Sequence, residues 1–163
     1  MRKWTLILVL LILVIFSSGC VNSDLSRMDQ LASTINDHLQ QGDSYYNQAV
    51  ASANKFQYEP ALTQANSASS EFDQGRSSTQ EALIYAQNSK EQVYINYFQL
   101  TLQELDLRIN ATSELKMAIP YLQSNETSTA NQHLNLANDY MEQSINLKTQ
   151  KDDLVTQNVA MFK

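Results

Sequence analysis

The amino-acid sequence predicts an all-α protein: an antiparallel bundle of about four long helices, arranged as two helical hairpins and preceded by an N-terminal signal or anchor segment. The 163 residues include only 3 Gly and 2 Pro, too few for the many tight turns of a β-sandwich, a β-barrel or an α/β fold. Apolar residues recur at spacings of three and four over long stretches, as on one face of a helix. Short polar segments separate these stretches, and short connections imply antiparallel neighbours.

The composition narrows the function classes. The formal net charge is −6, so the chain has no electrostatic reason to bind nucleic acid or anionic lipid heads. The chain has 1 Cys and 2 His, which excludes a disulfide framework and a Cys/His zinc cluster. The glycines do not cluster, so a Gly-rich phosphate loop is excluded as well. We therefore expect no metal and no cofactor.

The first twenty residues are typical of a secretory leader. Arg2 and Lys3 form a basic start, residues 6–16 are an unbroken apolar run, and Ser17 and Ser18 precede Gly19 and Cys20. A basic start, a short apolar stretch and small residues before a break define a signal peptide. The apolar run is too short for an ordinary transmembrane helix, which needs about 20 apolar residues.

The only cysteine follows directly after these small residues, and the segment resembles the lipobox of prokaryotic lipoprotein signal peptides. In that family a peptidase cuts before an invariant cysteine whose thiol carries a diacylglycerol-type lipid. The resemblance implies cleavage between Gly19 and Cys20 and lipid attachment at Cys20. Ser17 departs from the family pattern, which usually has Leu there. An uncleaved anchor helix over residues 4–21 is the alternative, and a bacterial and an archaeal origin both stay open.

Cleavage at this point would divide the chain into a signal peptide (1–19) and an extracytoplasmic helical-bundle domain (20–163). That domain loses Arg2 and Lys3, so its formal charge becomes −8. Two acyl chains anchor a protein stably, whereas one gives marginal binding. We therefore expect the lipid on Cys20 to hold the domain at the cell membrane, facing outside the cytoplasm.

Four helical stretches follow the leader, each with an apolar stripe. The stripes are Leu25, Met28, Ala32, Ile35, Leu39, Gly42, Tyr46, Ala49, Ala53 and Phe56; Leu62, Ala65, Ser69, Phe72, Arg76, Thr79, Leu83 and Ala86; Ile95, Phe98, Leu102, Leu105 and Ile109; and Ala130, Leu134, Ala137, Met141, Ile145, Val155, Val159 and Phe162. Pro60 is expected near the start of the second helix and a turn at 88–92. A break near 75–78 is an open alternative, the third stripe fades near Pro120, and residues 124–129 have loop composition.

The chain contains a faint internal repeat at an offset of 69 residues. Ala61, Ala68, Phe72 and Gln74 align with Ala130, Ala137, Met141 and Gln143 without gaps. This alignment suggests a duplicated helical hairpin. The run at 58–68 is loosely similar to the second helix of a tetratricopeptide repeat, but the repeat's Trp, Gly and terminal Pro positions are not filled.

Candidate catalytic groups are few. Carboxylates occur as Glu104 and Asp106 on the third stretch and as Asp152 and Asp153 on the fourth. Glycosidic bond cleavage needs paired acids, and adjacent residues on one helix point about 100° apart. We therefore expect these carboxylates to lie on solvated faces and the protein not to be an enzyme.

The remaining charged candidates have simple structural readings. We expect Arg108 to pair with Glu104, four residues before it, with its stem on the apolar row and its guanidinium in water. His38 and His133 are far apart and no Glu-x-x-His motif occurs, so we expect both at the surface or in the helix seams, without a metal.

Two further features concern the surface. Asn110 and Asn125 begin Asn-x-Thr sequons, which are N-glycosylation acceptors only outside the cytoplasm. The chain has 8 Tyr, which either pack structurally or line a groove that binds a solute or glycan.

The favoured function is a membrane-anchored surface lipoprotein that acts as a non-enzymatic helical interaction or scaffold module for an envelope protein, with a homo-oligomer possible. A ligand-binding lipoprotein with a Tyr-lined groove is the alternative.

Overall fold

The computed structural model describes the backbone of residues 2–162 and the side chains of residues 24–162. Four long helices follow one another: α1 (Arg2–Asn54), α2 (Tyr58–Ser89), α3 (Gln92–Gln123) and α4 (Thr127–Gln157). A short 3₁₀ helix, η1 (Val159–Met161), closes this part of the chain. The prediction of an all-α chain with four long helices is confirmed.

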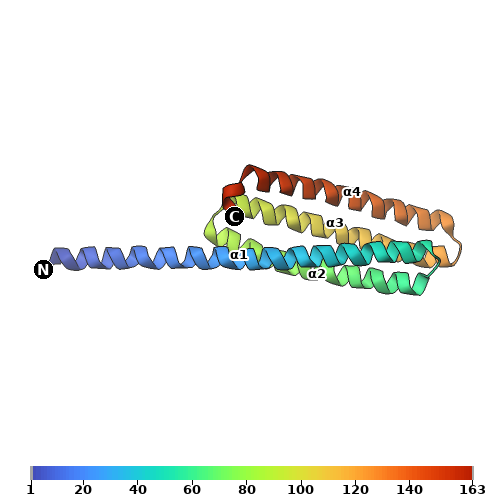
Figure 1. Cartoon of the computed structure of the whole chain (residues 1–163), viewed down its shortest axis with the longest axis horizontal. Helices are drawn as coiled ribbons and strands as arrows, with labels where there is room; N and C mark the ends of the chain where they lie inside the picture. Colours follow the sequence, from blue (N-terminus) through green and yellow to red (C-terminus); the bar gives the residue numbers. More distant parts are fainter. Residues whose placement is uncertain (1, 163) are drawn as a thin grey trace.

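The helices form two antiparallel hairpins, α1–α2 and α3–α4, that lie side by side through α2 and α3 (Figure 1). The turns of the two hairpins lie at one end of the bundle. The α2–α3 connection and the C-terminal end of α4 lie at the other (Figure 1). α1 and α4 scarcely touch, so the bundle is closed along three of its seams and open along the fourth.

α1 is a single helix that starts at Arg2 and continues into the bundle, and its N-terminal part projects beyond the other helices (Figure 1). Gly19 and Cys20 belong to the part of α1 whose side chains the structure does not describe. Among the described residues, no helix is both long and apolar enough to cross a membrane.

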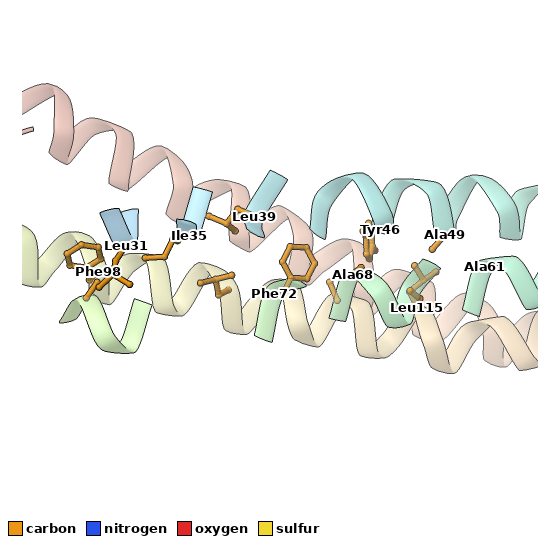
Figure 2. Packing of buried hydrophobic residues seen from close by; sticks show 14 of the residues in the cluster. Leu31, Ile35, Leu39, Tyr46, Ala49, Ala61, Ala68, Phe72, Phe98 and Leu115 are labelled. Atoms are coloured by element: carbon orange, nitrogen blue, oxygen red, sulfur yellow. The ribbon is translucent and has the colours of Figure 1, made fainter. Parts of the chain in front are cut away.

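The core runs along the whole bundle and follows the predicted stripe of α1 closely. Buried side chains of α1, α2 and α3, Phe72 among them, meet along its length (Figure 2). Three apolar residues of the predicted stripes are wrong as core positions: Phe56 is 78% exposed, Ile145 is 56% exposed and Val159, in η1, is 50% exposed. Phe56 lies in the α1–α2 turn, and Ile145 lies on α4 outside its buried row.

The predicted helix ends are largely correct. α2 ends at Ser89 and α3 begins at Gln92, which confirms the turn at 88–92. The possible break near 75–78 does not occur, because α2 is continuous and buries Gly75. Pro120 lies inside the last turn of α3, so that helix continues slightly past the predicted limit.

The two hairpin turns are alike and are offset by 69 residues. Phe56 and Asn125 both have a φ of 61°. The N–H of Gln57 donates to the Ser52 carbonyl at 2.9 Å, and the N–H of Glu126 donates to the Tyr121 carbonyl at 2.8 Å. The same turn geometry thus stands at equivalent positions of the two hairpins. A left-handed φ costs Phe56 on the order of 1 kcal/mol, whereas Asn tolerates it.

The buried faces of the helices also agree at this offset. In nine pairs both residues are buried: Ile35 and Glu104, Leu39 and Arg108, Gly42 and Ala111, Tyr46 and Leu115, Ala49 and Ala118, Ala61 and Ala130, Ala68 and Ala137, Gly75 and Ser144, and Ala82 and Lys151. The two hairpins therefore present the same faces to the common core, and they differ in the residues that fill some of those positions.

One of these differences is a close contact between α1 and α2. A Cβ built on Gly42 would lie 2.6 Å from Cδ1 and 2.8 Å from Cζ of Phe72. Phe72 is fully buried, so its ring has little room to move. In the second hairpin, Ala111 takes the place of Gly42 and Met141 takes the place of Phe72. Ala is larger than Gly, and Met is slimmer and more flexible than Phe.

We predict that Gly42→Ala destabilises the fold by about 2 kcal/mol, because overpacking forces a buried ring out of its place. Adding Phe72→Met recreates the pair found in the second hairpin and should recover part of that loss. Urea unfolding of both single variants and of the double variant measures the coupling. Additive effects of the two substitutions on stability would show that the Gly42–Phe72 contact does not set the distance between α1 and α2.

Candidate functional site

Three charged side chains are buried inside the second hairpin. Glu104 and Arg108 lie one turn apart on α3, and Lys151 lies on α4. Their exposed fractions are 1%, 5% and 5%. Full burial of charged residues is rare unless they are paired, so the arrangement of their partners determines what this cluster can do.

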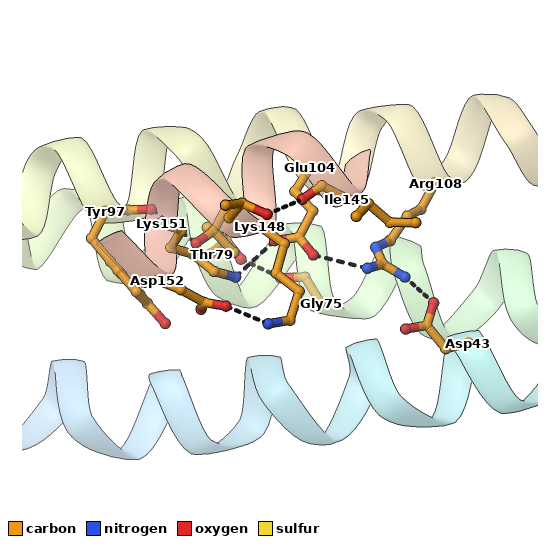
Figure 3. Close-up of polar contacts among 12 residues, drawn as sticks. Asp43, Gly75, Thr79, Tyr97, Glu104, Arg108, Ile145, Lys148, Lys151 and Asp152 are labelled. Atoms are coloured by element: carbon orange, nitrogen blue, oxygen red, sulfur yellow. Dashed lines mark hydrogen bonds and ion pairs between the residues drawn. The ribbon is translucent and has the colours of Figure 1, made fainter. Parts of the chain in front are cut away.

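Glu104 is the centre of the cluster (Figure 3). Its Oε1 accepts a hydrogen bond from Arg108 Nη2 at 3.0 Å, and its Oε2 accepts one from Lys151 Nζ at 2.7 Å. Arg108 Nη1 donates in the opposite direction to Asp43 Oδ1 on α1. The chain of ion pairs therefore runs from α4 through α3 to α1, across the seam where α1 and α4 scarcely touch.

Aromatic rings support both cations. The Arg108 guanidinium lies over the Phe72 ring, 5.9 Å from its centroid, and Lys151 Nζ lies 5.6 Å from the centroid of Tyr97. Desolvation by burial raises the pKa of the Asp43 carboxyl, although the Arg108 charge opposes this shift. Among the described residues, Arg108 Nε is a buried donor without a hydrogen-bond partner.

These residues line a groove of about 470 Å³ between α1 and α4. α1 contributes Asn36, Leu39, Gln40 and Asp43, α3 contributes Tyr97, Glu104 and Arg108, and α4 contributes Lys148, Lys151, Asp152, Val155 and Thr156. At the rim, Lys148 Nζ donates to Asp152 Oδ2 at 2.5 Å. We call this hollow the charged groove. Its volume is in the range of small-molecule sites.

The equivalent positions of the first hairpin are apolar. Ile35, Leu39 and Ala82 stand where the second hairpin has Glu104, Arg108 and Lys151, and all three are buried. The hairpin architecture thus accepts apolar residues at each of these places. The charges are a property of the groove rather than a requirement of the fold.

Sequence reasoning found part of this site. The pairing of Arg108 with Glu104 is confirmed at 3.0 Å, but the expectations that Glu104 is solvated and that the guanidinium reaches water are wrong. Both side chains are buried because the broad face of α3 contacts α1, α2 and α4. The sequence analysis did not single out Lys151, although the offset of 69 residues aligns it with Ala82, which is buried.

Of the other three predicted carboxylates, two lie outside the charged groove and one lines it. Asp106 pairs with Arg76 of α2 at 2.7 Å, outside the groove, and Asp153 is exposed on α4. Among the predicted carboxylates, Asp152 joins Glu104 in the lining of the charged groove, to which α1 adds Asp43.

Both histidines bridge helices. His38 Nδ1 lies 2.8 Å from Glu71 Oε2, and His133 Nδ1 lies 2.7 Å from Glu114 Oε2. The His133 ring also stacks on Tyr121, with 5.6 Å between the ring centroids. Within the described part of the chain, no three His, Cys, Asp or Glu side chains are placed to hold a metal ion.

The tyrosines do not gather in the charged groove. Tyr46 and Tyr94 are buried, and Tyr45, Tyr58, Tyr85, Tyr97 and Tyr140 pack against the core. Of the eight tyrosines only Tyr97 lines the charged groove. A binding surface built from several tyrosine rings is therefore not present there.

The sequons are accessible. Asn110 is exposed on α3, and Asn125 is exposed in the α3–α4 turn. Gly19 and Cys20, the predicted cleavage and lipid-attachment residues, lie outside the residues whose side chains are described.

Comparison with known protein families, with curated proteins and with solved structures finds no match to this chain.

We predict that the buried charges do not stabilise the fold relative to apolar residues. The triple variant Glu104→Ile, Arg108→Leu, Lys151→Met takes two of its residues from the first hairpin and keeps the length of the lysine stem. Replacing buried ion pairs with apolar residues of similar volume is often neutral or stabilising by about 1–4 kcal/mol. We expect the triple variant to unfold at an unchanged or higher urea concentration.

The matched control is Glu104→Ala alone, which leaves buried Lys151 without its ion-pair partner and Arg108 with Asp43 alone, and should cost about 3–5 kcal/mol. A triple variant as unstable as Glu104→Ala would show that the charges serve the fold itself.

Proposed function

We propose that the protein is a lipid-anchored, non-enzymatic interaction module that stands on the outer side of the cell membrane and holds an envelope protein. The observation that carries this proposal is the continuity of α1, which runs as one helix from Cys20 into the bundle. A helix transmits position and direction, whereas a flexible linker would leave the bundle free to tumble.

The anchor point and the bundle are close along this helix. Cys20 precedes Met28, a fully buried residue of α1, by eight positions, or about 12 Å of helix. A lipid on Cys20 would therefore hold the start of the bundle near the lipid heads. The bundle axis continues the direction of α1 (Figure 1), so the module extends away from the anchor.

The two hairpin turns form the end of the bundle farthest from Cys20 (Figure 1). Helices of about 30 residues place that end roughly 45 Å beyond the start of the bundle. Phe56 is exposed there with a left-handed backbone, and Asn125 of the second sequon lies at the equivalent position of the other turn. An exposed aromatic side chain is a common anchor of protein interfaces, so we place the partner contact at this end.

The chemistry of the described residues supports binding rather than catalysis. Each buried acid or base of the charged groove is paired with an opposite charge, which leaves none of them poised as an unpaired acid or base. The acidic net charge also favours a protein partner over nucleic acid.

The anchor is tested by fractionating cells that express Cys20→Ser. We expect the wild-type protein in the membrane fraction, and release of the variant, because the thiol that carries the lipid is gone. A Cys20→Ser protein that resists carbonate extraction as fully as the wild type would favour the uncleaved anchor helix over residues 4–21.

The partner contact is tested by placing a photo-crosslinking phenylalanine analogue at Phe56. We expect a discrete crosslinked envelope protein at this position, because the aromatic ring is retained and exposed. The matched control is the same analogue at Ile84, which is also exposed but lies on α2 near the opposite end. Equal crosslinking at both positions, or none at Phe56, would contradict a partner site at the far end of the bundle.

A further inference from the structure

The charged groove has a composition that the fold does not need. The first hairpin buries Ile35, Leu39 and Ala82 where the second buries Glu104, Arg108 and Lys151. Burying charged groups costs free energy even when they are paired. Local departures of this kind from the best core are typical of functional sites. The departure is confined to the wall of a single groove between α1 and α4.

The groove also has hydrogen-bonding capacity that the protein does not use. An ammonium group has three donors, and among the described residues Lys151 Nζ donates only to Glu104 and Lys148 Nζ only to Asp152. Arg108 Nε is a buried donor that has no partner in the described part of the chain. Both oxygens of Glu104 on α3 are occupied. On α4 the unused capacity consists of the two ammonium groups and of Asp152 Oδ1, since Asp152 accepts from Lys148 through Oδ2.

The opposite wall offers the complementary group. Asp43 on α1 uses only Oδ1, as the acceptor for Arg108, and its side chain remains partly open to solvent. Its second oxygen can accept a hydrogen bond from a ligand. Lysine donors on α4 and a carboxylate acceptor on α1 therefore line the same hollow.

The charge balance narrows the ligand further. The lining holds three basic side chains, Arg108, Lys148 and Lys151, and three acidic ones, Asp43, Glu104 and Asp152. A ligand with a net charge would leave a half-buried excess of that charge, which is costly in a medium of low dielectric constant. A ligand that carries one positive and one negative group keeps the groove neutral and satisfies both walls.

We propose that the charged groove binds a small zwitterionic solute, a free amino acid or a short peptide, with its carboxylate at Lys148 and Lys151 and its ammonium at Asp43. This site is separate from the partner contact at the far end of the bundle, and it does not depend on the lipid anchor. Its volume of about 470 Å³ suits a ligand of this size.

Titration calorimetry of the full chain in detergent micelles tests this proposal. The probes are alanine and the dipeptide Ala-Ala, with propionate, ethylamine and inorganic phosphate as carriers of a single kind of charge. We expect at least one zwitterion to bind about tenfold more tightly than propionate or ethylamine, because each of these makes only one of the two charge-assisted contacts.

Variants assign the binding to the groove. Lys148→Ala removes an exposed rim cation that the fold does not need, and it should weaken binding about tenfold. The triple variant Glu104→Ile, Arg108→Leu, Lys151→Met should abolish it. The matched control is Arg76→Ala, which removes an equally exposed basic partner from an ion pair outside the groove and should leave the affinity unchanged.

Three results would overturn the proposal. The first is that neither zwitterion binds at millimolar concentration to a chain with a native circular dichroism spectrum. The second is that propionate or phosphate binds as tightly as the zwitterions. The third is that Lys148→Ala leaves the affinity unchanged. None of them bears on the membrane anchor or on Phe56, so the two proposals fail independently.

Discussion

The packing of Phe72 of α2 joins the two halves of the bundle, because its ring lies against both α1 and α3. The ring fills the space that Gly42 leaves open on α1, and it lies beneath the Arg108 guanidinium of α3, 5.9 Å away. Because protein interiors are close-packed, a change in this ring would alter both the distance between α1 and α2 and the position of α3. The second hairpin makes its own version of the contact with Ala111 and Met141. The two hairpins can thus share one architecture without being interchangeable.

Comparing the two hairpins also explains why the seam between α1 and α4 is open. In a closed bundle of two equal hairpins, that seam would match the one between α2 and α3, where Gly75 allows Leu105 to approach closely. The second hairpin instead carries Glu104, Arg108 and Lys151 toward the open side. Buried charges require partners and room for hydrogen bonds. Small apolar residues cannot close over them, so a groove remains and Asp43 reaches across it.

The two proposed functions use different parts of one rigid body. The far end of the bundle depends on α1 as a stiff connection to Cys20, whereas the groove depends on contacts between α1, α3 and α4 along the side. Asp43 links the two, because it belongs to the helix that carries the anchor and it pairs with Arg108 in the groove. A solute held between α1 and α4 would tie the second hairpin more firmly to that helix.

The sequence by itself determined that the chain folds as four helices, where the turns lie and that the two hairpins repeat after 69 residues. Periodicity, turn residues and helix ends act over a few neighbouring positions, so they can be read without knowing the fold. The buried row of α1 was predicted almost residue by residue for this reason. The turn residue Phe56 was assigned to that row wrongly, because a spacing pattern does not show where the helix stops facing a neighbour.

Only the tertiary structure decided which polar residues are buried. A helix stripe is about 100° wide, and spacing alone does not fix its centre. Ile145 belongs to a predicted stripe and is exposed, whereas Glu104 and Lys151 lie beside the predicted stripes and are buried. The answer depends on where α1 and α4 lie relative to α3, and that placement results from packing between residues far apart in the chain. Burial at the edge of a stripe is therefore a property of the assembled helices, and the charged groove exists only once all of them are in place.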